Sequence, residues 1–358
     1  MTWDRLTVML VDDNRFVAGL LQSVLRAIGI QNVIVEEDGA TAIKRLKTAA
    51  EDPLGAGFRS IDLIISDYLM PTVDGMLFLR WLRTGENVPD RFAPFIMLSG
   101  AADRDIVEEG RDAGVTEFLA KPFSVASVTE RILHVINQPR RFVLANGYFG
   151  PNRRRRELPV ANERRSDSID DIEVVHFKAE QKSLRDDVRA IHFDLPNRLR
   201  EKLGVDAISG NVVVDPELIS DAEEKIQEMA GDYSDWVQHS IESLEKAHNA
   251  LAVVPPSEDD DDEDSLRNRR HLSRISRIAH ELRGQGGIFD YPLITALGRS
   301  LYAATKELYL PVTADRQKLI SAHIDAIKTV FKNRIRGGGG EVGRELMREI
   351  ASAVQRLT

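Results

Sequence analysis

Residues 61–67, IDLIISD, form a short apolar run that ends in an aspartate, and comparable runs closed by polar residues recur through the first 125 positions. The others are LTVMLVDD (6–13), APFIMLSG (93–100) and EFLAKP (117–122). Near-continuous apolar runs of this kind are typical of buried parallel strands. We therefore expect the strand ends to carry Asp12, Asp13, Asp67, Ser99 and Lys121.

Between these runs, apolar residues recur at helical spacing. They are Phe16, Leu20, Leu21, Val24, Leu25 and Ile28, then Ala42, Ile43 and Leu46, then Met76, Leu77, Leu79, Trp81 and Leu82. Regular alternation of strand and helix predicts an α/β fold with a doubly wound parallel sheet. Ligand sites in such sheets gather at the carboxyl ends of the strands.

Three carboxylates at one edge of a sheet repel each other, and a hard divalent cation such as Mg²⁺ relieves that repulsion. We expect Asp12, Asp13 and Asp67 to be the metal ligands. Asp67 would also be the nucleophile that attacks a phosphoryl group and becomes an acyl phosphate. The Lys121 ammonium and the Ser99 hydroxyl would stabilise charge on the transferring group.

These residues resemble the receiver domain of two-component response regulators over positions 5 to 137. The motifs that carry the resemblance are the acidic pair at 12–13, DYLMPTVDGM (67–76), LSG (98–100) and KPF (121–123), in the order and spacing of that family. The resemblance implies a five-stranded, flavodoxin-like sheet of order 2-1-3-4-5 and a cis peptide between Lys121 and Pro122. The alternative is a flavodoxin-like domain whose acidic loop residues have no shared function.

The resemblance also implies a conformational switch. Phosphorylation of Asp67 would turn Ser99 inward and let Phe118 settle behind it, which would reshape the face formed by the fourth helix, the fifth strand and the fifth helix of the receiver. Leu69, two residues after Asp67, is apolar and cannot position an attacking water. This residue predicts an aspartyl phosphate that hydrolyses slowly.

Length and composition limit the remaining possibilities. A chain of 358 residues exceeds the size at which single cores stop growing, so two or three domains are expected. A net charge of −9 argues against general nucleic-acid binding, and the lack of cysteine excludes thiolate zinc sites and thiol nucleophiles. No apolar run approaches the ~18 residues of a membrane span. We expect a cytoplasmic protein.

The composition of the sequence changes at Gln138, and we expect residues 138–214 to be a basic linker with a docking segment. Arginine, glycine, proline and asparagine are frequent here without helical spacing, and residues 153–156 are four arginines. That run is interpreted as a solvated tether, with an acidic partner or nucleic acid as the alternative. The segments IEVVHF (172–177) and VRAIHF (188–193) resemble short strands or helix ends, and NRLREKLG (197–204) closes with a helical turn.

Residues 215–358 follow a helical pattern throughout and predict a helical bundle. Asp215 followed by Pro216 is a helix start, and the apolar stripes break at Pro255, Pro292, Pro311 and the glycines at 337–340. An acidic loop at 258–264 separates the second and third helices.

The third of these helices carries the candidate chemistry. Its apolar stripe leaves a second face at spacings of three and four, made of Ser273, Ser276, Arg277, His280, Arg283, Gly284 and Gly287. Glycine inside a helix costs ~1 kcal/mol relative to alanine, so repeated glycine indicates close approach by another group. We expect His280 on this face rather than in the core, with Arg277 and Arg283 able to stabilise a phosphorylated imidazole.

The segment HELRGQGGIFDYPLI (280–294) is similar to the motif of histidine phosphotransfer domains. That resemblance implies that His280 is the phosphorylated histidine, that Arg283 takes the family's basic position in place of lysine, and that Gly284 takes the small position. An arginine at this position and a long acidic loop before the helix depart from the family pattern.

Two hypotheses follow. In the first, the protein is a phosphorelay intermediate, not an enzyme with its own ATP site, that uses both Asp67 and His280. Its partners would be a sensor histidine kinase, other receivers or phosphotransfer proteins, without membrane or nucleic acid. In the second, only the receiver is phosphorylated and the bundle is a docking or dimerisation module.

Overall fold

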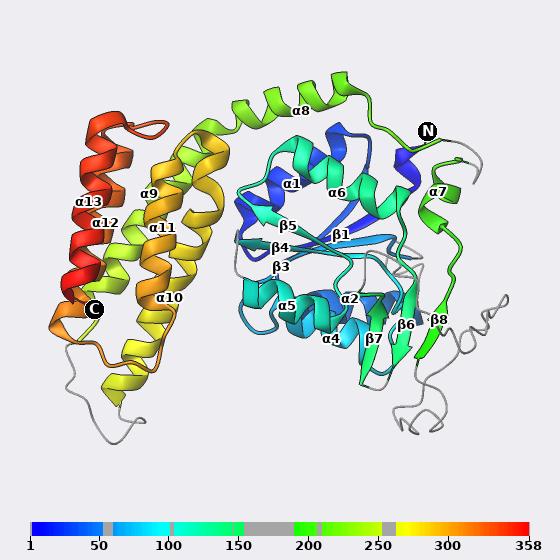
Figure 1. The fold of residues 1–358 in the computed structure, drawn as a ribbon, viewed down its shortest axis with the longest axis horizontal. Helices are drawn as coiled ribbons and strands as arrows, with labels where there is room; N and C mark the ends of the chain where they lie inside the picture. Colours follow the sequence, from blue (N-terminus) through cyan, green and yellow to red (C-terminus); the bar gives the residue numbers. More distant parts are fainter. Residues whose placement is uncertain are drawn as a thin grey trace, which may run out of the picture. The chain divides into compact units, whose positions relative to one another are not determined.

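The computed structural model of the protein describes residues 2–52, 60–100, 104–145, 147–153, 190–205, 210–252 and 263–357 (Figure 1). The chain forms two compact units, Met1–Ala120 with Ser124–Ile226 and Lys121–Phe123 with Gln227–Thr358, so the main division lies between Ile226 and Gln227. The helix α8 (Pro216–Glu228) spans this division. Each unit is described by itself.

The first unit is built on a five-stranded sheet of order β2-β1-β3-β4-β5, which confirms the predicted doubly wound α/β fold. Strand β1 pairs in parallel with β2 and β3, and β3 pairs in parallel with β4. The strands are β1 (Thr7–Val11), β2 (Asn32–Glu36), β3 (Leu63–Asp67), β4 (Phe95–Gly100) and β5 (Glu117–Lys121). Every residue of β3 is buried, as its continuous apolar run predicted.

Helices connect the strands and begin at residues that cap them. The side chains of Asn14, Asp38, Asp74 and Ser124 each accept hydrogen bonds from backbone N–H groups of the first helical turn. The helices are α1 (Arg15–Ala27), α2 (Gly39–Glu51), α4 (Gly75–Thr84), α5 (Arg104–Ala113) and α6 (Val125–Asn137), and a short 3₁₀ turn, η1 (Trp3–Arg5), precedes β1.

The stretch after α6 is not the exposed linker that we expected. Strands β6 (Phe142–Ala145) and β7 (Tyr148–Pro151) form a hairpin, and β8 (Ala190–Phe193) pairs with β6 on its other side, all antiparallel. The predicted helical turn in 197–204 is confirmed as α7 (Arg198–Lys202), which Gly204 follows with a positive φ of 71°. Residues 154–156 of the arginine run and the IEVVHF segment lie outside the described residues.

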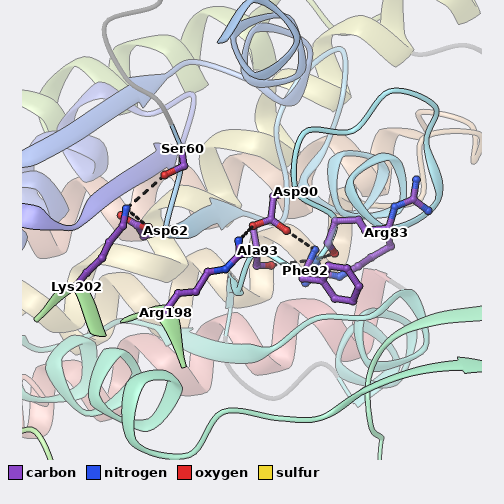
Figure 2. Close-up of polar contacts among 9 residues, drawn as sticks. Ser60, Asp62, Arg83, Asp90, Phe92, Ala93, Arg198 and Lys202 are labelled. Atoms are coloured by element: carbon purple, nitrogen blue, oxygen red, sulfur yellow. Dashed lines mark hydrogen bonds and ion pairs between the residues drawn. The ribbon is translucent and has the colours of Figure 1, made fainter. Parts of the chain in front are cut away.

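We name the described residues of 142–152 and 190–214 the extension, and they belong to the first unit. Aromatic packing explains why this basic sequence folds. The rings of Phe142, Phe149 and Phe193 surround Phe92, with centroids 5.2–5.7 Å from it. The basic side chains meet acidic residues of the receiver, since Lys202 Nζ lies 2.6 Å from Asp62 and Arg198 lies 3.5 Å from Asp90 (Figure 2). The segment therefore has the composition of a linker but folds into a three-stranded sheet.

The second unit is helical, as predicted. Helix α9 contacts α10 and α12, and α11 contacts the same two helices, so the four form a helical bundle. Helix α13 packs on α12. Their bounds are α9 (Ala230–Asn249), α10 (Glu263–Gln285), α11 (Pro292–Thr305), α12 (Ala314–Lys332) and α13 (Gly340–Leu357), with the 3₁₀ turn η2 (Gly286–Phe289) after α10. The Asp215 carboxylate accepts from the Glu217 N–H at 3.0 Å, which confirms the predicted start of α8. The last helix starts at Gly340, the last of the four glycines that were predicted to precede it. Most of the acidic loop lies outside the described residues.

Among the described residues, the structure holds no helix that is both long and apolar enough to cross a membrane.

Gly298 sets the distance between α10 and α11. A Cβ at this position would lie 2.6 Å from the Arg283 backbone nitrogen and 2.9 Å from the Ala279 carbonyl oxygen. Real side chains do not approach a backbone so closely, so the absence of a side chain lets the two helices cross at short range. This crossing brings α11 side chains against the candidate histidine of α10.

His323 predicts a pH dependence of the helical unit. Its ring is fully buried between the Leu319 carbonyl oxygen at 2.7 Å and the Ser300 hydroxyl at 2.8 Å, and burial lowers its pKa below 6.5. The unfolded state therefore binds the proton first, so this contribution to stability is complete above pH ~6.5 and declines as the pH falls below it. We expect a smaller loss of thermal stability between about pH 7.5 and about pH 5.5 for His323→Gln than for wild type. His239→Gln, at an exposed position, is the control, and equal losses in all three proteins would contradict this role.

Candidate functional site

Three carboxylates meet at the carboxyl edge of the sheet. Asp12 and Asp13 follow β1, Asp67 ends the neighbouring β3, and one oxygen of each lies within 4.8 Å of the others. This is the cluster that the sequence predicted. Asp12 and Asp67 are only 2% and 3% exposed, so water screens their mutual repulsion poorly. Oxygen ligands in this number and spacing fit a hard divalent cation.

Local hydrogen bonds orient the two buried carboxylates. Asp12 Oδ1 accepts from the Asn14 N–H at 2.9 Å, and Asn14 in turn caps α1. Asp67 Oδ1 accepts from the Tyr68 N–H at 2.9 Å. These two bonds fix the direction in which each carboxylate presents its oxygens.

Gly75 allows the chain to fold closely around Asp67. A Cβ on Gly75 would lie 2.0 Å from the Asp67 carbonyl oxygen, and the Gly75 N–H donates to the Tyr68 carbonyl at 3.0 Å. Only glycine fits this approach. Helix α4 therefore starts directly beside the candidate nucleophile, with Asp74 as its cap.

The remaining predicted receiver residues end the other two strands. Ser99 lies at the end of β4 and Lys121 at the end of β5, and both are buried. The predicted cis peptide between Lys121 and Pro122 is confirmed. Phe118 packs on the core beside α5, where a Cβ on Gly110 would lie 2.6 Å from its ring.

Glu36, at the end of β2, adds a fourth carboxyl group to this region. Its carbonyl oxygen accepts from the Asp12 N–H at 3.1 Å. Burial raises the pKa of the Glu36 side chain, while Arg45, 3.8 Å away, acts in the opposite direction. Glu36 was not among the predicted site residues, although its place at the end of an apolar run, NVIVEE, could have indicated it.

A parallel α/β sheet with three carboxylates, a hydroxyl and a lysine at its carboxyl edge defines the receiver class of signalling domains. The sequence model of the response regulator receiver domain matches residues 8–133. The probable chemotaxis protein CheY of Rhizobium etli is 31% identical over 129 residues, which cover 36% of this chain and 91% of that protein. This chain belongs to the response regulator receiver domain family and carries a receiver domain of a two-component system.

Other similar proteins cover the same part of the chain. Chemotaxis protein CheY-3 of Vibrio cholerae is 27% identical over 125 residues, 35% of this chain and 87% of that protein. The solved structure of Vibrio cholerae chemotaxis protein CheY4 is 26% identical and covers 36% of this chain and 98% of that chain, with a TM-score of 0.30. These matches leave about two thirds of the chain, including α8 to α13, to be interpreted from its own residues.

His280 lies on α10 and contacts both its own helix and α11. The Arg283 guanidinium lies 3.1 Å from His280 Nδ1, and the ring meets Tyr302 edge-on at 5.4 Å between centroids. Arg283 also lies over the Tyr302 ring, 4.9 Å from its centroid. Within the helical unit, His280 therefore contacts side chains of both α10 and α11. Helical spacing within α10 could not show that α11 crosses here.

The other predicted neighbours have different surroundings. Arg277 is paired with Glu281 at 4.0 Å, one turn along the helix, and Gly284 lies in the last turn of α10. Tyr302 is the residue that sequence reasoning missed, because its relation to His280 depends on the Gly298 crossing four residues earlier.

The contact with Arg283 fixes the proton on the ring. A guanidinium group only donates, so Nδ1 must accept, and the neutral imidazole carries its proton on Nε2. In this arrangement the Nε2 lone pair is not available as a nucleophile.

Proposed function

We propose that this protein is a phosphoacceptor whose receiver takes a phosphoryl group on Asp67. The observation that carries this role is the close group of Asp12, Asp13 and Asp67 at the carboxyl edge of the sheet. A carboxylate oxygen of Asp67 would form the new bond to phosphorus as the bond to the leaving group breaks and that group keeps the electron pair. Lys121 would neutralise charge on the phosphoryl oxygens, and Ser99 would donate a hydrogen bond.

Magnesium fits the three carboxylates, because their oxygens are hard ligands and their buried charge needs compensation. When bound, the ion would neutralise part of the charge on the phosphoryl oxygens. The three aspartates would hold it, and Asn14 keeps Asp12 in the orientation that this requires.

Labelling with acetyl phosphate tests this role. We expect Mg²⁺-dependent incorporation of one phosphoryl group, mapped to Asp67 by mass spectrometry and lost on treatment with either acid or alkali. Chelation of the metal should prevent it. A label at another residue, or one that forms equally well without divalent cations, would overturn the proposal.

Leu69 predicts the lifetime of this acyl phosphate. Its aliphatic side chain offers no hydrogen bond to an attacking water, so hydrolysis should be slow. We expect a half-life well beyond seconds in wild type and faster decay in Leu69→Asn, whose amide can hold a water. The decay of label after removal of acetyl phosphate measures both, and a wild-type half-life of seconds would contradict this prediction.

We further propose that His280 exchanges phosphoryl groups with aspartate sites, which would make the protein a phosphorelay intermediate. Support comes from the HELRG sequence at 280–284 and from the Arg283 guanidinium 3.1 Å from the ring. After transfer, Arg283 could pair with the phosphoryl oxygens. The partners would be a sensor histidine kinase and other receiver or phosphotransfer proteins.

One observation favours the second candidate, a docking module controlled by the receiver. Nδ1 of His280 accepts from Arg283, and Tyr302 holds both side chains, which gives His280 a structural role. For transfer through Nε2, Arg283 would have to leave Nδ1 so that the ring proton can move there.

A His280→Gln variant separates these candidates. For a relay, we expect wild type to show alkali-stable label at residue 280 after treatment with acetyl phosphate or phosphoramidate, and the variant to lose this label while Asp67 is still labelled. His239→Gln should behave like wild type. Absence of label from His280 with both donors would leave the docking module as the function of the helical unit.

A further inference from the structure

We propose that the extension is a coupling element, which joins the ends of α5 and α6 to the start of α8 and so passes the state of the receiver to the rest of the chain. This inference rests on the proposed phosphorylation of Asp67. It assigns a role to the described residues of 142–152 and 190–214, which follow the region that the family model covers.

The hairpin lies directly on the end of α5. A Cβ on Gly150 would lie 2.8 Å from the Gly114 Cα, so the two backbones touch where α5 runs into β5. Arg153 adds an ion pair to Asp112 at 3.3 Å and covers the Tyr148 ring at 4.1 Å. A displacement of α5 must therefore move β7 or break these contacts.

Helix α5 also contacts the interior of the receiver. Gly110 is close enough to Phe118 that an added Cβ would lie 2.6 Å from its ring. Phe118 lies on β5, three residues before Lys121 of the candidate phosphorylation site. Helix α5 and the residue that follows it thus contact both the strand that leads to Lys121 and the hairpin.

The second part of the extension is fastened to the end of α6. The Asn137 side chain donates to the Val212 carbonyl and accepts from the Val212 N–H, both at 2.8 Å. The Asn197 side chain donates to the Ile136 carbonyl at 2.7 Å. Two of these bonds come from one amide, and they hold the chain three residues before Asp215, which caps α8.

The two parts are joined into one body. Strand β8 pairs with β6 in a continuous register, with Val143 opposite His192. From β8 the chain enters α7, whose Lys202 contacts Asp62, the residue before β3 (Figure 2). Asp62 also accepts a hydrogen bond from the Thr7 N–H at 2.8 Å. The extension therefore reaches α8 through ordered contacts on three receiver elements, α5, α6 and β3.

Packed interfaces of this kind shift between discrete arrangements rather than deform continuously. A change at Phe118 and α5 on phosphorylation would be transferred through the Gly114 and Gly150 contact to the hairpin, and from β8 to the residues before α8. The receiver would thereby act on α8 through the extension.

Hydrogen exchange with mass spectrometry tests this coupling on the full chain. Mg²⁺ and beryllium fluoride, a mimic of the phosphoryl group, would be added to wild type, to Asp67→Asn and to Asn137→Ala. We expect a several-fold change in exchange for peptides from 142–152 and 210–228 in wild type, and none in Asp67→Asn. In Asn137→Ala the hairpin should respond as in wild type, while the response at 210–228 is lost.

Fluorine NMR of bound beryllium fluoride distinguishes a failure of the proposed phosphorylation site from a failure of the coupling element. No bound signal in wild type would mean that the proposed phosphorylation site fails. A bound signal with exchange changes confined to 2–137 would overturn the coupling element alone. If Asn137→Ala reduces stability, Asn137→Asp keeps one acceptor for the Val212 N–H and should retain part of the response, whereas an unchanged response at 210–228 in both variants would also overturn it.

Discussion

An Asp67→Asn variant is expected to take up no phosphoryl group from acetyl phosphate, a loss of roughly 100-fold or more in labelling rate, because an amide is not a nucleophile for phosphorus. The substitution keeps the shape of the side chain, and its oxygen can still accept from the Tyr68 N–H. One of three mutually repelling carboxylates is removed, so the receiver should fold at least as stably as wild type.

Asp74→Asn is the matched control for this variant. Asp74 is also an aspartate of the loop after β3, but its carboxylate caps α4 by accepting from the Leu77 N–H at 2.7 Å. Asparagine caps helices as well as aspartate does, so both labelling and stability should remain near wild type. Full labelling of Asp67→Asn, with the label on another residue, would show that Asp67 is not the acceptor.

An Arg83→Met variant is expected to lose about 3–5 kcal/mol of stability in the first unit. The substitution removes a fully buried guanidinium and leaves its hydrogen-bond acceptors without a donor. The Arg83 Nε donates to the Gly114 carbonyl at 2.9 Å, and its Nη1 donates to the Arg91 and Ala93 carbonyls at 2.6 and 2.9 Å. Burial lowers the pKa of Arg83 to about 10, so it stays charged at neutral pH, and it lies 5.2 Å from the Phe142 ring. Methionine would leave three carbonyls without their donor.

Arg80→Met, one helical turn earlier, is the control. Arg80 is half exposed and pairs with Glu109 at 2.7 Å, so its removal should cost less than about 1 kcal/mol. Thermal unfolding of the full chain, followed by calorimetry, compares the two variants. For a unit of this size, the Arg83 substitution corresponds to a fall of roughly 10 °C in its transition. Equal shifts in both variants would show that the Arg83 hydrogen bonds contribute little.

The receiver fold and its acidic site could be predicted from sequence because they depend on local pattern. Strand β3 is buried throughout, so its run of apolar residues is unbroken, and Asp67 stands where that run ends. In a parallel sheet, strand ends converge whatever the helices do in detail. Asp12, Asp13 and Asp67 could therefore be placed together without knowledge of a single contact.

The extension and the surroundings of His280 could not be predicted in this way. Strands β6, β7 and β8 have four residues each, and their packing depends on Phe92, which is distant in sequence. The arginines around these strands resemble those of a solvated linker in composition. Arg153 and Arg198 nevertheless form ion pairs with receiver aspartates. Likewise, the orientation of His280 follows from Tyr302 on another helix.

The contacts of the extension limit where this receiver can be joined to the output domain of another protein. A receiver is usually treated as a module that ends with its last helix, which here is α6 and ends at Asn137. A cut at that point would remove Phe142, Phe149 and Phe193 from Phe92 and take the Phe142 ring away from the Arg83 guanidinium. A receiver that is transplanted with these contacts must include Val214, so a chimera that exchanges output domains should be joined no earlier than the start of α8.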